Sequence, residues 1–419
     1  MKRALVLGGG GSKGAYEIGV WKALKELNIK IDIVTGTSIG ALIGCMVVQD
    51  DYEAALDLWT NIKVDSVMKN GLNLDMDIEL IMSQKSKFKE VFSSLVSNKG
   101  ADITPLIQMI DNIFNPDKFF NSPIDYGCMS VKVKEFKGHP IIKSQMNADN
   151  SRDYLLASAS CFPAFPLKEI DGEYYADGGY YDNVPIHLAQ LLGADEIIAV
   201  DLKSIGVKQE VIEQNRLIYI SPFVPLGSFL NFDQDLVKRN IDLGYYDTMR
   251  KYHKYLGYEY TFELSELENL NKLEQTIKTN LLKETIGNNI DNIVHVEKIF
   301  KDIEAEYPNV LSLEHPYLRL YELLAEYLEL EVLHTYTIEE FSNLLITNFE
   351  QRKLLKNIRW NELKSILTDF KNVSSVDIIG FIYQELINNK SLMNLNYMLT
   401  LFKKEFVLAI FLKLLHDSM

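Results

Sequence analysis

A serine flanked by glycines is the first feature of this sequence that could do chemistry. It lies in GTSIG (36–40), between an apolar run typical of a buried strand and an apolar stretch typical of a helix. In a G-x-S-x-G turn the serine sits on a sharp bend with its Oγ exposed, and Gly36 and Gly40 leave room for that bend. The helix N-terminus would stabilise negative charge that develops on Ser38. Ser38 is therefore a candidate nucleophile, and a simple helix N-cap is the alternative.

The glycine loop GGGSKG (9–14) is the second candidate, because it follows a short apolar run and precedes a helical pattern. Glycines let backbone N–H groups approach a ligand, and the next helix adds partial positive charge, so the loop favours an anion. That anion could be a dinucleotide phosphate, since the loop matches G-x-G-x-x-G, or an oxyanion formed in acyl transfer. A plain tight turn is the third interpretation. Asp32 disfavours the dinucleotide, because it starts the second strand instead of ending it.

A nucleophilic serine needs a proton acceptor, and the best candidate is an aspartate. No supporting motif surrounds the histidines His139, His187 and His253. Asp177 is followed by Gly178 and Gly179, so a strand should end there in a tight turn that could aim the carboxylate at Ser38. Partial burial would raise the pKa of this aspartate and make it a better base. A solvated Asp-Gly-Gly turn is the alternative. The neighbouring Asp182 and Asn183 are interpreted as shaping the loop.

Taken together and in this order, the motifs GGGSKG (9–14), GTSIG (36–40) and DGG (177–179) resemble the patatin-like phospholipase family in its bacterial form. The segments ASASCFPAFP (157–166) and DNVP (182–185) also resemble that family's pattern. The resemblance covers about residues 1–250. It implies a three-layer α/β domain with a central, mostly parallel sheet, and a hydrolase that cleaves lipid acyl esters with a Ser–Asp dyad.

Matched position by position, the resemblance implies that Ser38 is the nucleophile and Asp177 the proton acceptor. The N–H groups of the oxyanion hole would come from Gly9, Gly10 and Gly11, and the supporting loop positions are Lys13, Gly14, Gly36, Gly40, Gly178 and Gly179. The resemblance implies no metal and no cofactor, and a lipid or phospholipid as substrate. Head group, acyl position, chain length and oligomeric state stay open. The alternative is a lipid-binding or regulatory protein on the same fold, with little catalytic activity.

The elements that would position these motifs alternate in type along the first half of the chain. Helical patterns cover 14–27 and 39–48, and strand-like runs lie at 4–9, 31–36, 129–136, 195–202 and 216–221. Strands separated by helices predict a mostly parallel sheet with helices on both faces. Strand patterns nearly vanish after residue 256, where long helical periodicities begin. We therefore expect an acyl hydrolase domain at 1–256 and a mostly helical region of unknown role at 257–419.

Composition limits the remaining possibilities. A net charge of −15 lacks the basic footprint of a nucleic-acid binder. The three cysteines, Cys45, Cys128 and Cys161, are too scattered for a disulfide framework or a metal site, which fits a reducing compartment. No secretory signal and no apolar run of about 18 residues stands out. These features predict a cytoplasmic protein that could contact a membrane peripherally.

Three further segments are candidates for substrate access. The segment PFVPLGSFLNF (222–232) is apolar and aromatic, and residues 392–415 have the pattern of a basic amphipathic helix. Packing inside the protein is the alternative for both. Residues 66–122 contain many apolar side chains between the motifs, and we expect them to form a cap or lid over the site.

Overall fold

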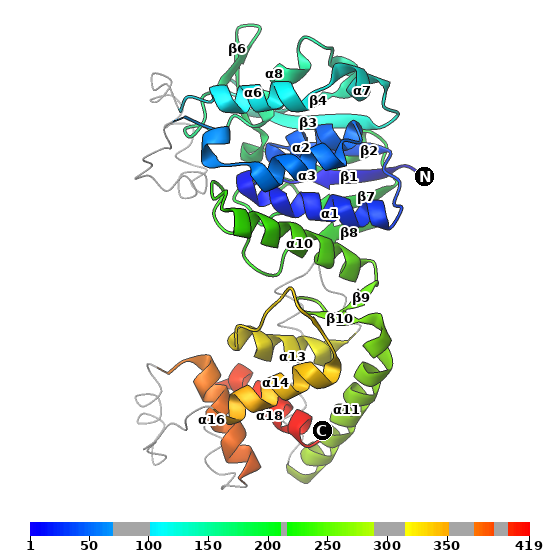
Figure 1. Ribbon diagram of the computed structural model, residues 1–419, viewed down its shortest axis with the longest axis vertical. Helices are drawn as coiled ribbons and strands as arrows, with labels where there is room; N and C mark the ends of the chain where they lie inside the picture. Colours follow the sequence, from blue (N-terminus) through cyan, green and yellow to red (C-terminus); the bar gives the residue numbers. More distant parts are fainter. Residues whose placement is uncertain (70–100, 211–215, 289–314, 352–372, 389–400) are drawn as a thin grey trace. The chain divides into compact units, whose positions relative to one another are not determined.

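A computed structural model describes residues 1–69, 101–210, 216–288, 315–351, 373–388 and 401–419. The chain divides into two compact units, Met1–Lys251 and Tyr252–Met419 (Figure 1). Buried hydrophobic clusters lie within each unit, and each is described by itself. The functional division that the sequence predicts after residue 256 stays a prediction.

An eight-stranded sheet lies at the centre of the first unit. Its parallel part has the order β3-β2-β1-β7-β8, with the bounds Asp125–Lys132, Ile33–Thr37, Arg3–Leu7, Glu196–Val200 and Arg216–Ile220. Antiparallel strands extend the sheet beyond β3, namely β4 (Lys137–Ile142), β6 (Glu173–Asp177) and β5 (Lys168–Ile170). Leu7 pairs with Gly36 and with Val200, so the parallel strands end at one shared edge. The predicted mostly parallel sheet is confirmed.

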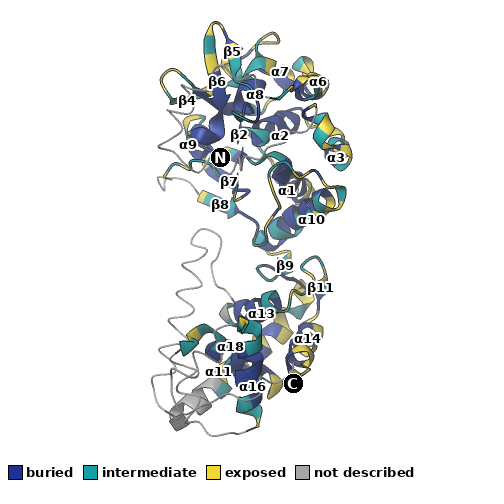
Figure 2. Ribbon diagram, turned by 90° about the vertical axis from the view of Figure 1, so that its left-hand side faces the viewer, coloured by how far each residue is buried: buried dark blue, intermediate teal, exposed yellow. Residues whose placement is uncertain are grey.

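Helices cover both faces of this sheet and complete three layers (Figure 2). Side chains alternate along β1 because successive strand residues face opposite sides. Ala4 and Val6 pack in the cluster that contains α9 (Ile186–Leu191). Leu7 lies on the other side, against α2 (Ile39–Val48), where α1 (Ala15–Glu26) and α10 (Gln234–Lys251) form the outer layer.

The crossing of α1 and α10 depends on two glycines. A Cβ at Gly19 would lie 1.8 Å from the carbonyl oxygen of Ile241, and one at Gly244 would lie 2.0 Å from that of Tyr16. No other residue permits this backbone approach without a shift. Because α1 begins directly after the glycine loop, this crossing helps to hold that loop in place.

Among the other described helices of the first unit, α6 (Thr104–Ile113), α7 (Pro116–Asn121) and α8 (Ser151–Ser158) lie on the side of β3 and the antiparallel strands. The helix α3 (Tyr52–Asn61) packs beside α1, α2 and α10 instead. The predicted lid at 66–122 includes α6 and α7, and its residues 70–100 lie outside the described part of the chain.

The strand predicted at 129–136 differs most from the structure. It begins earlier, at Asp125, and ends at Lys132, because residues 133–136 turn back into β4. The sequence does not indicate β4, whose residues include Pro140 and are at least partly exposed, except for the buried Ile141. A strand without apolar alternation has no periodic signal.

The second unit is mostly helical, as predicted, and has its own core. Its helices are α11 (Leu267–Asn288), α13 (Pro316–Tyr327), α14 (Ile338–Glu350), α16 (Ser375–Ile387) and α18 (Lys403–His416). A short sheet joins β9 (Tyr255–Leu256), β10 (Thr261–Glu263) and β11 (Thr335–Tyr336), for which the sequence gives no clear pattern.

The apolar side chains of α18 pack inside the second unit. Phe411, Leu412 and Leu415 are buried in its core, which supports the packing alternative for the amphipathic pattern at 392–415. Residues 392–400 of that pattern lie outside the described residues. None of the helices in the described part of the chain is both long and apolar enough to cross a bilayer.

Candidate active site

Ser38 occupies a strained turn between β2 and α2. Its backbone angles are φ 55° and ψ −124°, a conformation that a serine rarely adopts. The turn requires glycines, because a Cβ at Gly36 would lie 2.3 Å from the carbonyl oxygen of Gly40, and one at Gly40 would lie 2.4 Å from that of Leu7. The Ser38 N–H donates to Ser158 Oγ at 3.0 Å, and that hydroxyl donates to the Met129 carbonyl at 2.6 Å. Strain of this kind persists only where surrounding contacts enforce it.

Asp177 ends β6 and is almost completely buried. Its Oδ1 accepts a hydrogen bond from the Gly179 N–H at 2.8 Å, and a Cβ at Gly178 would lie 2.3 Å from the Met129 carbonyl oxygen. The turn therefore fixes the carboxylate. Burial raises the pKa of Asp177 to about 6, although the nearby Ser38 hydroxyl and the Gly179 N–H lower it.

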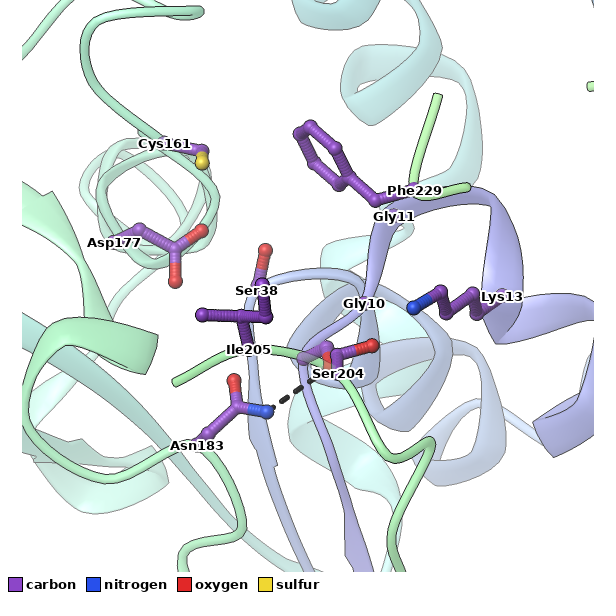
Figure 3. A pocket seen from close by; sticks show the side chains of 11 residues that line it. Gly10, Gly11, Lys13, Ser38, Cys161, Asp177, Asn183, Ser204, Ile205 and Phe229 are labelled. Carbon is purple, nitrogen blue, oxygen red and sulfur yellow. Dashed lines mark hydrogen bonds between the residues drawn. The ribbon is translucent and has the colours of Figure 1, made fainter. Parts of the chain in front are cut away.

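The two groups that the sequence predicts as a dyad line the same pocket. Figure 3 shows the Ser38 hydroxyl and the Asp177 carboxyl facing each other in this pocket. The pocket has a volume of about 390 Å³. It is lined by Gly9, Gly10, Gly11, Lys13, Ser38, Cys161, Asp177, Asn183, Ser204, Ile205 and Phe229, and we call it the catalytic pocket.

Asn183 holds the glycine loop from the side of the pocket. The side-chain Nδ2 of Asn183 donates to the Gly9 carbonyl at 3.1 Å, and the main-chain carbonyl of Asn183 accepts from the Gly9 N–H at 3.0 Å. A Cβ at Gly9 would lie 2.4 Å from Asn183 Oδ1. The Gly9 N–H is therefore already occupied, which corrects the expectation that it would serve the oxyanion hole. Sequence reasoning interpreted Asn183 only as a loop-shaping residue.

Gly10 and Gly11 differ from Gly9, because neither N–H has an acceptor among the described residues. A Cβ at Gly10 would lie 2.5 Å from Ser204 Oγ, and one at Gly11 would lie 2.2 Å from the Phe229 carbonyl oxygen. Gly11 also has φ +56°, which favours glycine. Two backbone donors are thus left available on the wall of the pocket that contains Ser38.

Lys13 and Gly14 support the loop in different ways. Lys13 has only 9% of its surface exposed and adds a positive charge to the catalytic pocket. Gly14 lies under α2, where a Cβ would be 2.9 Å from the side chains of Ile39 and Trp59. The predicted loop residues are therefore brought together with Ser38 and Asp177.

The apolar segment 222–232 packs against the glycine loop. The Phe229 carbonyl accepts from the Ser12 N–H at 2.9 Å, and Leu226 and Phe232 are buried. Phe229 of this segment, which the sequence analysis marked as a candidate for substrate access, lines the catalytic pocket. Ser204, from the loop after β7, also lines this pocket and was missed, because no local pattern marks it and only the fold brings it to Ser38.

The structure also places the residues of the two alternatives that the sequence disfavours, a histidine base and a ribose contact by Asp32. No histidine is among the residues of the catalytic pocket in the described part of the chain. Asp32 lies at the start of β2, where its Oδ2 accepts from the Arg3 N–H at 3.0 Å, at the opposite end of the strand from Ser38. This position is unsuited to a ribose contact at the carboxyl ends of the strands.

Comparisons with known proteins agree with this fold. Residues 5–189 match the family model of patatin-like phospholipases. The chain is 30% identical over 208 residues to patatin-like phospholipase domain-containing protein 7 of Mus musculus, which covers 48% of this chain and 14% of the mouse protein. It is 29% identical over 201 residues to lysophospholipase nte1 of Aspergillus oryzae, covering 48% of this chain and 12% of the fungal protein. The chain thus matches about one seventh of the length of these relatives.

Among solved structures, VipD from Legionella pneumophila is similar with a TM-score of 0.39 and 13% identity, over 99% of this chain and 91% of that chain. This similarity is too low to support an assignment of function. The fold and the family match together define an α/β domain of the patatin type. Residues 5–189 therefore form a patatin-like phospholipase domain.

Proposed function

We propose that the first unit is a serine-dependent lipid acyl hydrolase, in which Ser38 is the nucleophile and Asp177 the proton acceptor. The observation that carries this proposal is the strained Ser38 turn, which opens into the same pocket as a buried aspartate and two loop N–H groups that have no acceptor among the described residues. The similarity to a lysophospholipase over half of the chain supports a phospholipid or lysophospholipid ester as substrate.

The first half of the reaction forms an acyl-enzyme. Ser38 Oγ attacks the ester carbonyl carbon while its proton passes to the Asp177 carboxylate. The N–H groups of Gly10 and Gly11 donate to the oxyanion, with Lys13 adding positive charge nearby. When the tetrahedral intermediate collapses, the C–O bond to the alcohol breaks, and the alcohol takes the proton from Asp177.

The second half releases the fatty acid. A water molecule loses a proton to Asp177 and attacks the acyl carbonyl, and Ser38 leaves with that proton. The interaction of the Ser38 hydroxyl with the Asp177 carboxyl, which lowers the pKa of Asp177, agrees with this cycle, because the proton acceptor must lie within hydrogen-bond reach of the proton it takes.

Hydrolysis of p-nitrophenyl butyrate tests the proposal. Wild type should release nitrophenol, and Ser38→Ala should reduce kcat/KM by about 10³-fold or more with an unchanged circular dichroism spectrum. A folded wild type that binds lipid vesicles but hydrolyses neither this ester nor any of a panel of phospholipids would instead support the lipid-binding alternative.

A further inference from the structure

A second pocket meets the catalytic pocket at Ser38. It has a volume of about 450 Å³ and shares Gly11, Ser38, Cys161 and Phe229 with the catalytic pocket. Its other walls come from α2, α6 and three loops, and they include Ile62, Val67, Leu106, Met109, Phe165 and Phe232. We call it the apolar pocket.

We propose that the apolar pocket binds the acyl chain of the substrate, and that Leu106 and Met109 on α6 set the chain length it accepts. This inference rests on the proposed function. Because the acyl carbon bonds to Ser38 Oγ in the intermediate, its chain must leave Ser38 in one direction. The apolar pocket is a hydrophobic space that Ser38 itself lines.

The side chains that line the two pockets indicate which pocket holds the acyl chain of the ester and which holds its alcohol group. No charged side chain lines the apolar pocket in the described part of the chain, whereas Lys13, Asp177 and Asn183 line the catalytic pocket. A polar alcohol group would lose its hydration in the apolar pocket without gaining partners. Burial of methylene groups there is favourable instead. The acyl chain therefore takes the apolar pocket, and the alcohol side faces the polar walls.

The position of Leu106 and Met109 on α6 indicates that they form the wall of the apolar pocket that limits the length of the acyl chain. Leu106 and Met109 are three positions apart, so they share one face of the helix, and both are buried. Neither lines the catalytic pocket. Ile107 lies on the same helix but is 41% exposed and is not part of either pocket, which makes it a matched control position.

The test compares kcat/KM for p-nitrophenyl butyrate, octanoate and dodecanoate in the full chain. Each methylene that the pocket receives should raise kcat/KM by up to about fourfold. Met109→Trp fills the pocket and should lower the dodecanoate-to-butyrate ratio by about tenfold or more. Leu106→Ala widens the pocket and should shift the preferred ester toward longer chains. Ile107→Trp should keep the ratio of wild type.

Three results would overturn the inference while leaving the proposed function intact. The first is a wild-type kcat/KM that does not depend on the chain length of the ester. The second is the same dodecanoate-to-butyrate ratio in wild type, Met109→Trp and Leu106→Ala. The third is an equal fall of this ratio in Ile107→Trp and Met109→Trp. If Met109→Trp does not fold, the comparison of Leu106→Ala with wild type tests the inference by itself. Failure of wild type to hydrolyse even butyrate would instead contradict the proposed function itself.

Discussion

At the residue scale, the carboxyl of Asp177 departs clearly from its behaviour in water. Burial raises its pKa to about 6, so it is mostly ionised at neutral pH but becomes protonated in mild acid. A protonated Asp177 cannot accept the Ser38 proton. The effect of Asp177 on stability runs in the opposite direction to its effect on activity. Because its pKa is higher in the folded than in the unfolded chain, this carboxyl lowers the free energy of unfolding as the pH rises.

We predict that kcat/KM for p-nitrophenyl butyrate rises with pH with a midpoint near pH 6, because only the ionised carboxylate is a base. Asp182 is a matched control, since it is also buried and its pKa is raised to about 7 by burial, yet it does not line the catalytic pocket. Folded Asp182→Asn should keep the midpoint of wild type. A midpoint that follows Asp182 instead would contradict the role of Asp177.

Asn183 should position the glycine loop. Asn183→Ala removes the hydrogen bond to the Gly9 carbonyl and leaves this buried oxygen without its partner. We expect a loss of stability of about 1–2 kcal/mol and a fall in kcat of about tenfold, equivalent to ~1.4 kcal/mol in the barrier. Thermal unfolding and steady-state kinetics measure the two effects.

Gln49→Ala is the control for this position. Gln49 is also a buried amide, and its Nε2 donates to the Ile113 carbonyl at 2.9 Å, but it does not line either pocket. It should cost similar stability and leave kcat unchanged. Equal effects on kcat in both variants would show that Asn183 acts only through general stability.

At the element scale, the contact between α1 and α10 links the outer helices to the glycine loop. Gly244→Ala would bring a Cβ within 2.0 Å of the Tyr16 carbonyl oxygen, so the two helices must move apart. We predict a loss of stability of about 2 kcal/mol or more, typical of overpacking a tight core, and a lower rate of ester hydrolysis. Urea unfolding and the butyrate assay measure these changes.

The control for this crossing is Gly193→Ala. A Cβ at Gly193 would meet no atom within 4 Å, so only its φ of +86° penalises alanine, at a cost of about 1 kcal/mol. Activity should stay at the wild-type level. The role of the crossing would be wrong if Gly244→Ala were no more harmful than Gly193→Ala.

The sequence predicts those elements whose signals are local. The apolar runs of β1, β2 and β7 are buried on both faces, and the helix expected at 39–48 coincides with α2. Ser38 and Asp177 could be found because their glycines neighbour them in the chain. The segment 222–232 was noticed for its apolar and aromatic residues, but Ser204 and the pairing of Gly9 with Asn183 could not be found, since these contacts join segments that are distant in sequence. β4 lacks apolar alternation, so only its pairing with β3 in the structure identifies it as a strand.

At the scale of the whole molecule, every residue of both pockets lies in the first unit. The second unit contains a buried cluster in which Arg319 contacts the carboxylates of Glu259, Glu322 and Glu326, at 3.4, 3.2 and 2.6 Å. Glu322 also accepts from the N–H of Tyr258 at 2.7 Å, so it fixes the turn before β10. This cluster belongs to the core of the second unit and has no part in the proposed chemistry.

Arg319→Met should therefore separate the stability of the second unit from the activity of the first. Removing the arginine leaves buried carboxylates without their cation, which costs about 3–5 kcal/mol. Lys272→Met is the control, because its ion pair with Glu268 is exposed and contributes little. We predict that circular dichroism in urea shows a helical loss at lower urea for Arg319→Met only, while butyrate hydrolysis persists. Parallel loss of both signals would contradict this separation.

Covalent labelling by a fluorophosphonate tests the central claim most directly, because this reagent traps an activated serine. Peptide mapping by mass spectrometry should find the phosphonyl group on Ser38 of the wild-type chain, and Asp177→Asn should slow labelling by about 10²-fold or more, the range for loss of a general base. A label on another residue, or an equal rate in Asp177→Asn, would contradict the Ser38–Asp177 dyad.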